Sequence, residues 1–384
     1  LGAKRVRAMT SPDTAPADDL LPEGLEDRLP REASAATQAM RAILSAMDAQ
    51  GYDRVRPPLI EFEKSLAGRM EGVHTRRMVR FTDPVSLRTL ALRSDMTVQV
   101  GRIAATRMAG APRPLRLCYG GEVATIRSDH LDPARQRLQL GAELIGSDSV
   151  EAAVQIVLLA LEALEAAGVP NVSVDFTLPD LVDTLAEAAF PLAGAEVEAV
   201  RRELDTKDAG GLAQVPGGEA YLPLLYAAGP FDAAVERLAA IDAKGALASR
   251  IKGLRSIAAA VGDRARLTLD PSERHGFEYQ SWFGFTLYAD GARGALGRGG
   301  TYSIKGSDEV ATGFSLYMEP VLDALGGGVE ELRPAVFLAL GHDRAAAAAL
   351  RAMGWRTLAA VSESDDAAAL GCTHRLEGGA AVPL

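Results

Sequence analysis

Two segments of the sequence carry polar side chains at spacings that would suit a small-ligand site. In "LALRSDMTVQV", Asp95 and Thr97 follow a strand-like run and fall in the predicted first turn of a helix that has Ser94 as its N-cap. In "RQRLQLGAELIG", apolar residues alternate with polar or bare ones, so Gln139 and Glu143 share one face of a predicted strand. Carboxylate and amide oxygens at these positions would accept hydrogen bonds from a ligand's cationic or N–H groups.

Each of these residues also has a purely structural explanation. Taken alone, Asp95 is a first-turn carboxylate that the helix dipole favours. Gln139 and Glu143 are equally typical of a solvated strand face, although the bare Gly141 between them favours a polar floor. Tyr302, which follows the weak turn signal "GRGG", is by itself typical of a packed aromatic residue with its hydroxyl at the surface.

The segment "GGTYSIKGSDEVATGFSLYMEP" (299–320) runs from a glycine-rich turn through an apolar stretch toward a helix-like run. This order is typical of a nucleotide-binding region, yet the segment contains no arginine. Phosphate groups are usually held by cationic side chains, and arginine offers the best-matched fork of donors. The segment therefore has the form of a nucleotide site without the charge that such a site needs.

Composition excludes several classes of protein. The 384 residues carry a formal net charge of −10, which argues against a surface built to neutralise nucleic-acid phosphates. Two cysteines, and five histidines without metal-ligand spacing, predict neither a disulfide framework nor a metal site. No stretch has the length and apolar character of a membrane span or signal peptide, so we expect a cytoplasmic protein without membrane contact.

The elements that would position these residues predict an α+β fold. Several alternating strands with intervening helices indicate an antiparallel sheet covered by helices on one face. The run "GYDRVRPPLIE" reads as a strand that ends at a double proline, which suits an edge. We expect a disordered arm over residues 1–19, a main domain over 20–328 with a helical insertion at about 181–262, and a truncated α/β segment over 329–384.

Several segments taken together, in order, resemble the motifs of class II aminoacyl-tRNA synthetases as found in histidyl-tRNA synthetase. They are "LLPEGLEDRLP", "GYDRVRPPLIE", "LALRSDMTVQV", "CYGGEV" with "RQRLQLGAELIG", and "GGTYSIKG" with "ATGFSLYMEP". The resemblance covers about residues 20–325. "LLPEGLEDRLP" and "LRSDMTVQVGRIA" are more similar to the synthetase's paralogues, the ATP phosphoribosyltransferase regulatory subunits.

The resemblance implies a binding site for L-histidine. Asp95 stands where the synthetase has the glutamate that receives the histidine ammonium group, and Thr97 follows it as in that motif. Gln139 and Glu143 match a glutamine and a glutamate on the strand face, and the glutamate approaches the imidazole ring. Tyr302 falls where a tyrosine closes over the ring.

The resemblance also implies that the ATP side of the synthetase site is degenerate. Gly120 occupies the arginine position of the second motif, and Pro320 occupies that of the third. His275 stands in place of the arginine of a histidine-specific segment, unless a one-residue shift places Arg274 there. Without these cations, the phosphates of ATP would lack their partners.

These implications favour a non-catalytic regulatory subunit of ATP phosphoribosyltransferase, the first enzyme of histidine biosynthesis. Its partner would be the short-form catalytic subunit, and the first motif would supply a dimer contact within a hetero-oligomer. We expect no cofactor, and no tRNA because only a remnant of an anticodon-binding domain follows the third motif. The alternative is a divergent ligase that adenylates histidine with other cations, such as Arg127, Arg135 or Arg137.

Overall fold

The computed structural model of the chain describes residues 20–67, 78–126, 134–242, 244–274, 280–304, 307–326 and 334–384. The chain divides into two compact units. One holds Ala36–Gly326 with the segment that ends at Arg28, and the other holds Gly327–Leu384 with Leu29–Ala35. The expected disordered arm over residues 1–19 lies outside the described residues.

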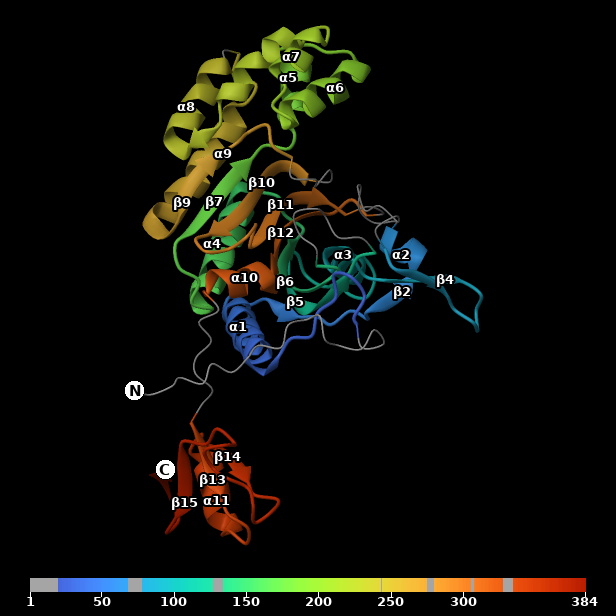
Figure 1. Cartoon of the computed structure of the whole chain (residues 1–384). Coiled ribbons are helices and arrows are strands. Elements are labelled where there is room, and N and C mark those ends of the chain that lie inside the picture. Colours follow the sequence, from blue (N-terminus) through green and yellow to red (C-terminus); the bar gives the residue numbers. More distant parts are fainter. Residues whose placement is uncertain are drawn as a thin grey trace. The chain divides into compact units, whose positions relative to one another are not determined.

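A nine-stranded sheet forms the centre of the first unit (Figure 1). Its neighbours are antiparallel except for the pairs β1 with β5 and β7 with β9, which are parallel. The predicted α+β class is confirmed, with a mixed rather than purely antiparallel sheet. In spatial order the strands are β1 (Asp53–Arg54), β5 (Leu115–Ala124), β6 (Gln136–Ile145), β12 (Val310–Tyr317), β11 (Gly297–Ser303), β10 (Gln280–Ala289), β7 (Val172–Thr177), β9 (Arg266–Leu269) and β8 (Gly229–Pro230).

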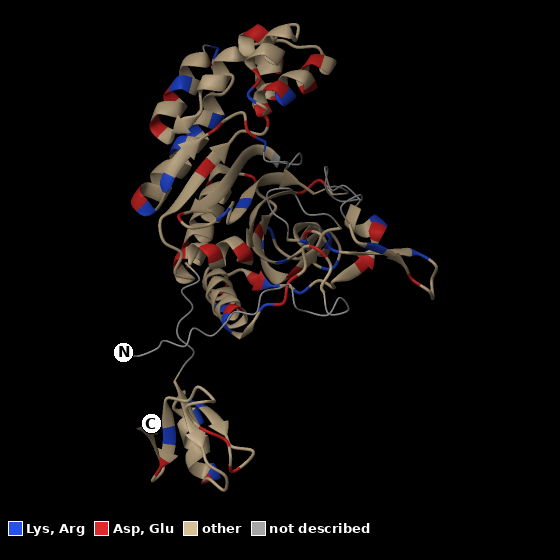
Figure 2. Cartoon of the chain, in the orientation of Figure 1, with Lys and Arg blue, Asp and Glu red and all other residues tan. Residues whose placement is uncertain are grey.

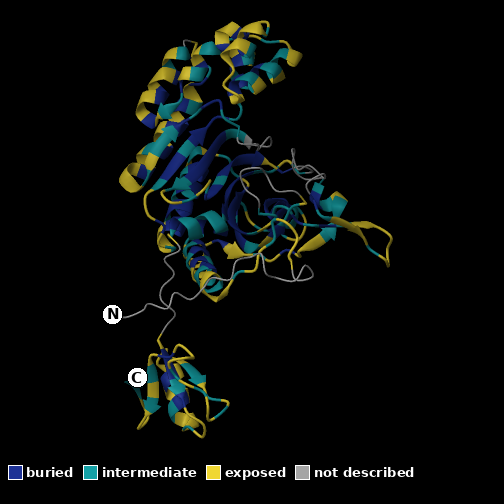
Figure 3. Ribbon diagram, viewed as in Figure 1, coloured by how far each residue is buried: buried dark blue, intermediate teal, exposed yellow. Residues whose placement is uncertain are grey.

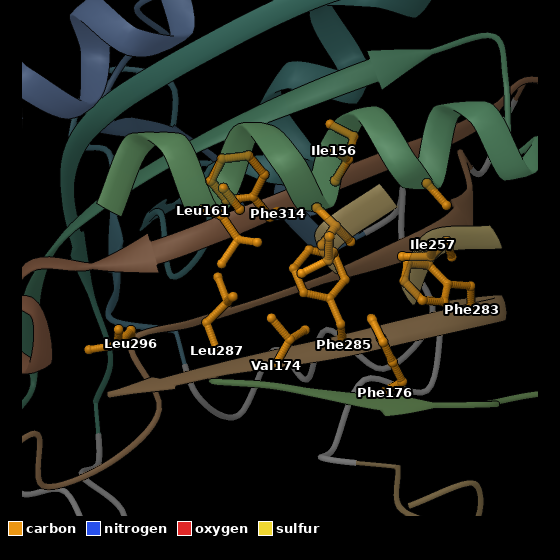
Figure 4. Close-up of a cluster of buried hydrophobic side chains, with 14 of the residues drawn as sticks. Ile156, Leu161, Val174, Phe176, Ile257, Phe283, Phe285, Leu287, Leu296 and Phe314 are labelled. Carbon is orange, nitrogen blue, oxygen red and sulfur yellow. The ribbon is translucent and has the colours of Figure 1, made fainter. Parts of the chain in front are cut away.

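Helices α1 (Pro30–Ala49), α4 (Val150–Ala166), α9 (Ala248–Val261) and α10 (Met318–Ala324) bury apolar side chains in the main core. Figure 4 shows α4 lying along the strands, with Ile156 and Leu161 directed toward the sheet and Phe285 and Phe314 directed toward the helix. Ser149 caps α4, because its hydroxyl accepts a hydrogen bond from the N–H of Ala152 at 3.1 Å. We call this side of the sheet its core face.

The opposite side, which we call the site face, also carries a helix. Helix α3 (Thr97–Ala105) lies near β6, and its buried Val98, Val100 and Ala104 share an apolar cluster with Leu117 of β5. The expectation that helices cover one face only is therefore wrong. The run of buried residues along α3 requires a second apolar surface, and the β5 end of the site face supplies it.

The predicted strand in "GYDRVRPPLIE" is split in two. Only β1 (Asp53–Arg54) joins the large sheet, at its edge, while β2 (Ile60–Phe62) joins a small sheet with β4 (Thr89–Leu92) and β3 (Arg80–Thr82). The two prolines between β1 and β2 lack backbone N–H groups and so cannot continue a ladder. A short helix, α2 (Glu63–Ala67), follows β2.

A helical region separates β7 from β9, and among its described residues only β8 is a strand. It packs onto the main core through α9, where a Cβ on Gly253 would lie 3.0 Å from the Trp282 ring. Figure 3 shows exposed outer faces on these helices and buried strands in the sheet below them. The helices are α5 (Leu181–Ala188), α6 (Gly194–Asp205), α7 (Ala209–Gln214), the 3-10 helix η4 (Gly218–Tyr226), α8 (Phe231–Ile241), α9 and the 3-10 turn η5 (Gly262–Arg264).

The second unit has its own small α/β core. Strand β13 (Ala335–Leu338) lies parallel to β14 (Arg356–Ala359) and to β15 (His374–Glu377), and β15 forms a hairpin with β16 (Ala380–Pro383). Helix α11 (Arg344–Ala352) is capped by the Asp343 carboxylate, which accepts bonds from two backbone N–H groups. The cluster of buried residues consists of Val336, Leu338, Ala347 and Leu350.

Candidate functional site

Strand β6 brings the predicted polar residues onto the site face of the sheet. Leu140 and Ala142 point into the main core, while Gln139 and Glu143 point the other way. Both polar side chains are nevertheless buried, with 0% and 1% of their surface exposed. The interpretation of this strand face as solvated is therefore wrong, because α3 and its preceding turn lie over it.

Asp95, Thr97 and Gln139 meet at the start of α3. The Asp95 carboxylate accepts hydrogen bonds from the Thr97 backbone N–H at 2.7 Å and from the Gln139 amide at 3.2 Å. In return, the Gln139 oxygen accepts from the Met96 N–H at 2.9 Å. Helix α3 begins at Thr97 with Met96 as its N-cap, so the predicted cap at Ser94 is wrong. An Asx turn of Asp95 satisfies the first helical N–H group instead.

Glu143 lies between two phenols. Its carboxylate accepts a hydrogen bond from the Tyr119 hydroxyl at 3.0 Å and another from the Tyr302 hydroxyl at 2.8 Å. Burial raises the pKa of Glu143 to about 8, although both phenols favour the charged form and oppose the rise. Burial also raises the pKa of Asp95, against the bonds from Thr97 and Gln139. A ligand with a cationic or N–H group would therefore stabilise the charged form of both carboxylates.

Tyr119 and Ser315 join these two groups into one network, which we call the Glu143 network. The Tyr119 hydroxyl lies 3.0 Å from the Thr97 hydroxyl and 3.0 Å from the Ser315 hydroxyl. Ser315 also accepts from the Gln139 amide at 2.8 Å. All five predicted histidine-site residues thus belong to one hydrogen-bonded unit: Asp95, Thr97, Gln139, Glu143 and Tyr302.

Sequence reasoning missed Tyr119 and Ser315, although Gly141 gives a signal for the first. Tyr119 pairs with Gly141 across β5 and β6, and a Cβ on this glycine would lie 2.4 Å from the phenol oxygen. Only a bare position lets the ring cross β6 toward Glu143. Ser315 stands in a strand pattern that apolar neighbours dominate, so nothing in the sequence singles it out.

A strip of the site face beside Glu143 carries no side chains. Gly284, Gly300 and Gly313 are consecutive partners across β10, β11 and β12, and Gly313 in turn pairs with Glu143. A Cβ on Gly313 would lie 1.7 Å from a Glu143 carboxylate oxygen, so this glycine is required where the carboxylate crosses it. Glycine within a strand often marks a place where a ligand or another part of the chain approaches the backbone closely.

The interpretation of Gly120 as a lost phosphate-binding position is not supported. Its missing side chain would point into the main core, 3.5 Å from Leu140 and 3.6 Å from Leu44. The neighbouring Gly121 faces the site side instead, and there a Cβ would lie 2.3 Å from the guanidinium of Arg93. Arg93 is buried and donates to the carbonyls of Glu122 and Pro57 at 2.7 and 2.8 Å. Because side chains alternate between the two faces along β5, position 120 faces the core and not, as the motif comparison had implied, the site.

Among the other degenerate positions, Pro320 is the third residue of α10. Proline fits this first turn because its N–H group would have no partner within the helix. The neighbouring Glu319 pairs with Arg28 and accepts from the Leu138 N–H at 3.3 Å. His275, expected in place of a third arginine, lies outside the described residues, as does Arg127.

The other cations named for a ligase have structural contacts. Arg135 donates to the backbone carbonyls of Thr125 and Glu23. The Arg137 guanidinium lies over the Tyr317 ring, 5.5 Å from its centroid. In the described part of the chain, no group of three or more metal-ligating side chains lies close enough together to hold an ion. Among the same residues, no helix has the length and apolar character needed to cross a membrane.

Comparison with known proteins identifies the family. A family model described as Histidyl-tRNA synthetase matches residues 24–321. An ATP phosphoribosyltransferase regulatory subunit of Rhodospirillum centenum is 40% identical over 380 residues, covering 97% of this chain and 98% of its own length. The ATP phosphoribosyltransferase regulatory subunit of Paramagnetospirillum magneticum is 42% identical over 366 residues, covering 93% of this chain and 96% of its own length.

A solved structure supports the fold. The ATP phosphoribosyltransferase regulatory subunit/histidyl-tRNA synthetase from Bacillus halodurans C superposes with a TM-score of 0.79 at 19% identity, over 93% of this chain and 97% of that one. At this identity the likeness concerns the fold alone. The curated relatives, which match nearly the whole chain at about twice that identity, carry the assignment to a family. The chain belongs to the family of ATP phosphoribosyltransferase regulatory subunits, built on a histidyl-tRNA synthetase-like domain.

Proposed function

We propose that this chain is a non-catalytic regulatory subunit that binds L-histidine in the Glu143 network and assembles with a short-form ATP phosphoribosyltransferase catalytic subunit in the cytoplasm. The complex would carry out the first step of histidine biosynthesis and respond to its end product. The observation that carries the proposal is the convergence of five expected side chains on one buried network.

The network fits the donors of histidine. Asp95 and the Gln139 oxygen offer acceptors for an ammonium group, and Glu143 offers one for a ring N–H. The glycines at positions 284 and 300 would let an imidazole ring approach the backbone beside Glu143. We expect the site to need no cofactor and to take L-histidine as its ligand.

Feedback inhibition requires a difference in affinity between states. Histidine shifts the complex toward a less active arrangement only if it binds that arrangement more tightly. Helix α3 is well placed to respond, because Asp95 satisfies its first N–H group and its residues Val98 and Ala104 pack on the site face. We propose that the chain also dimerises through its first motif within the hetero-oligomer.

The proposal excludes tRNA as a partner. The net charge of −10 opposes the binding of a polyanion. Figure 2 shows acidic and basic residues intermixed along the described helices and strands. A catalytic role in adenylation would need cations for the phosphates of ATP, and Pro320 offers none at its position.

The test mixes the purified chain with a short-form catalytic subunit. Sedimentation velocity would detect the complex, and initial rates with and without histidine would detect regulation. We expect the complex to turn over faster than the catalytic subunit alone, and histidine to slow it. Asp95→Asn should keep the Asx turn and the complex but weaken inhibition about 10–100-fold, because it removes a charge-assisted bond.

A matched control is available in Asp83→Asn. Asp83 also forms an Asx turn, accepting from the Val85 N–H at 3.1 Å, but it lies in an exposed loop between β3 and β4. Its replacement should leave inhibition by histidine unchanged. If no complex forms and the chain alone exchanges pyrophosphate into ATP when histidine is present, the chain is a ligase and the proposal is wrong.

A further inference from the structure

The Glu143 network lacks one group that a free amino acid needs. Asp95 and Glu143 are both acidic, and Thr97, Gln139 and Tyr302 are neutral. A free amino acid carries an α-carboxylate beside its ammonium group, and a buried or half-buried carboxylate requires a cation or several N–H donors. Such a cation has to lie near the Asp95 end of the network, where the ammonium group would be.

Strand register places Arg298 beside this end. Arg298 of β11 pairs directly with Ser315 of β12, and Ser315 pairs with Gly141 of β6. Directly opposed residues in antiparallel strands have their Cβ atoms about 4.5–5.5 Å apart. Since the Ser315 hydroxyl contacts both Gln139 and Tyr119, the Arg298 side chain starts one strand from the centre of the network.

Arg298 points to the same face as the network. It alternates with Gly300 and Tyr302 along β11, and the Tyr302 hydroxyl reaches Glu143. The next position on this face, Gly300, carries no side chain. Arg298 is half-buried and so partly shielded from water.

Tyr317 lies in this part of the site face, and Arg298 lies within electrostatic range of it and of Tyr288 on β10. It follows Ser315 on the same face of β12 and pairs with Gln139. Burial raises the pKa of the Tyr317 phenol, the charge of Asp95 raises it further, and the charges of Arg137 and Arg298 lower it. One phenol therefore lies within electrostatic range of Asp95 and of both guanidinium groups.

We propose, on the basis of the histidine site proposed above, that Arg298 binds the α-carboxylate of the ligand and so makes the site selective for a free amino acid. Guanidinium groups match carboxylates with two parallel N–H donors. Arg137 lies on the same face of β6 as Gln139, but its guanidinium lies over the Tyr317 ring and its strand partner is Val123 on β5. The geometry thus assigns the carboxylate to Arg298 rather than to Arg137.

The test compares two probes by isothermal titration on the full chain, alone and with the catalytic subunit. L-histidine carries the carboxylate, whereas L-histidinol keeps the ammonium and imidazole groups but has a hydroxymethyl group instead. The wild-type chain should bind histidine about 10–100-fold more tightly than histidinol, the range expected for a charge-assisted pair. Arg298→Gln should lose this preference while its affinity for histidinol stays within about threefold of wild type.

Three further variants separate the possible outcomes. Arg298→Lys keeps the charge without the fork and should retain part of the preference, which also covers the case in which Arg298→Gln does not fold. Arg137→Gln should keep the preference. Arg293→Gln, at an exposed pair with Asp323, controls for the loss of one positive charge.

Two results would overturn the assignment. If Arg298→Gln and Arg298→Lys both keep the full preference for histidine, or if Arg137→Gln abolishes it, Arg298 does not bind the carboxylate. If the wild-type chain binds neither probe, alone or with the catalytic subunit, the histidine site itself is wrong and this inference falls with it.

Discussion

The phenol oxygen of Tyr119 lies 3.0 Å from a carboxylate oxygen of Glu143, and it reaches that position by crossing the bare Gly141 on β6. The same hydroxyl lies 3.0 Å from Thr97 and 3.0 Å from Ser315. One hydroxyl thus connects the carboxylate expected near the imidazole ring with the helix start that carries Asp95. The hydrogen bonds of Tyr119 are therefore the most direct way to test the network.

Tyr119→Phe should destabilise the protein and weaken histidine binding. It leaves the buried hydroxyls of Thr97 and Ser315 and the Glu143 carboxylate each without one partner, which costs about 1–3 kcal/mol in the free energy of unfolding. Urea denaturation would measure this change. Tyr226→Phe serves as the matched control, because Tyr226 is 72% exposed and its hydroxyl can bond to water. Equal stability of the two variants would contradict a structural role for the Tyr119 hydroxyl.

Gly141→Ala should disturb the packing of β6 against Tyr119 of β5 and Phe314 of β12. The new Cβ would lie 2.4 Å from both the Tyr119 hydroxyl and the Phe314 carbonyl, so a strand or the ring must move. We expect the free energy of unfolding to fall by about 1–3 kcal/mol, as for an overpacked core. Gly194→Ala, at the open first position of α6, should be neutral or slightly stabilising. Thermal unfolding of both variants checks the contrast.

Gly313→Ala should weaken ligand binding as well as destabilise the protein. Its Cβ would coincide with the present position of the Glu143 carboxylate, which lies 1.7 Å away, and would also reduce the bare strip. We expect histidine affinity to fall more than about tenfold, equivalent to about 1.4 kcal/mol. Gly294→Ala, in open space, should bind normally. Histidine affinity within twofold of wild type in Gly313→Ala would count against the placement of the imidazole ring.

The raised pKa of Glu143 predicts a specific pH dependence of stability. The folded protein keeps the Glu143 proton up to about pH 8, whereas the unfolded chain releases it near the ordinary value of 4.5. Between these values the folded state binds more protons, so the free energy of unfolding falls as pH rises, by up to about 1.4 kcal/mol per pH unit. The fall should end above about pH 8.

Urea denaturation of the wild type and of Glu143→Gln at pH 5.5, 6.5, 7.5 and 8.5 would isolate this contribution. Glu273, whose pKa burial raises to about 7, and Asp95, whose pKa is also raised, contribute slopes of the same sign in both proteins. The difference between the two curves therefore belongs to Glu143. Parallel curves over this range would show that Glu143 does not titrate there.

The sequence by itself predicted the class of fold and the local element on which each proposed site residue lies. Alternation along β6 placed Gln139 and Glu143 on one strand face, and the strand-to-helix boundary placed Asp95 and Thr97 at a helix start. These assignments depend on spacing within one segment, which the period of a strand or helix determines. Only the resemblance to a known family assigned these four residues, together with Tyr302, to a histidine site.

Tertiary structure decided what no single segment encodes. It determined that Gln139 and Glu143 are buried, because α3 covers the site face, and it placed Gly120 toward the core. It brought Ser315 and Arg298 beside residues more than 150 positions earlier in the chain, through the pairing of β12 with β6 and of β11 with β12. Cross-strand register arises from long-range pairing, so a local pattern cannot predict which side chains will meet.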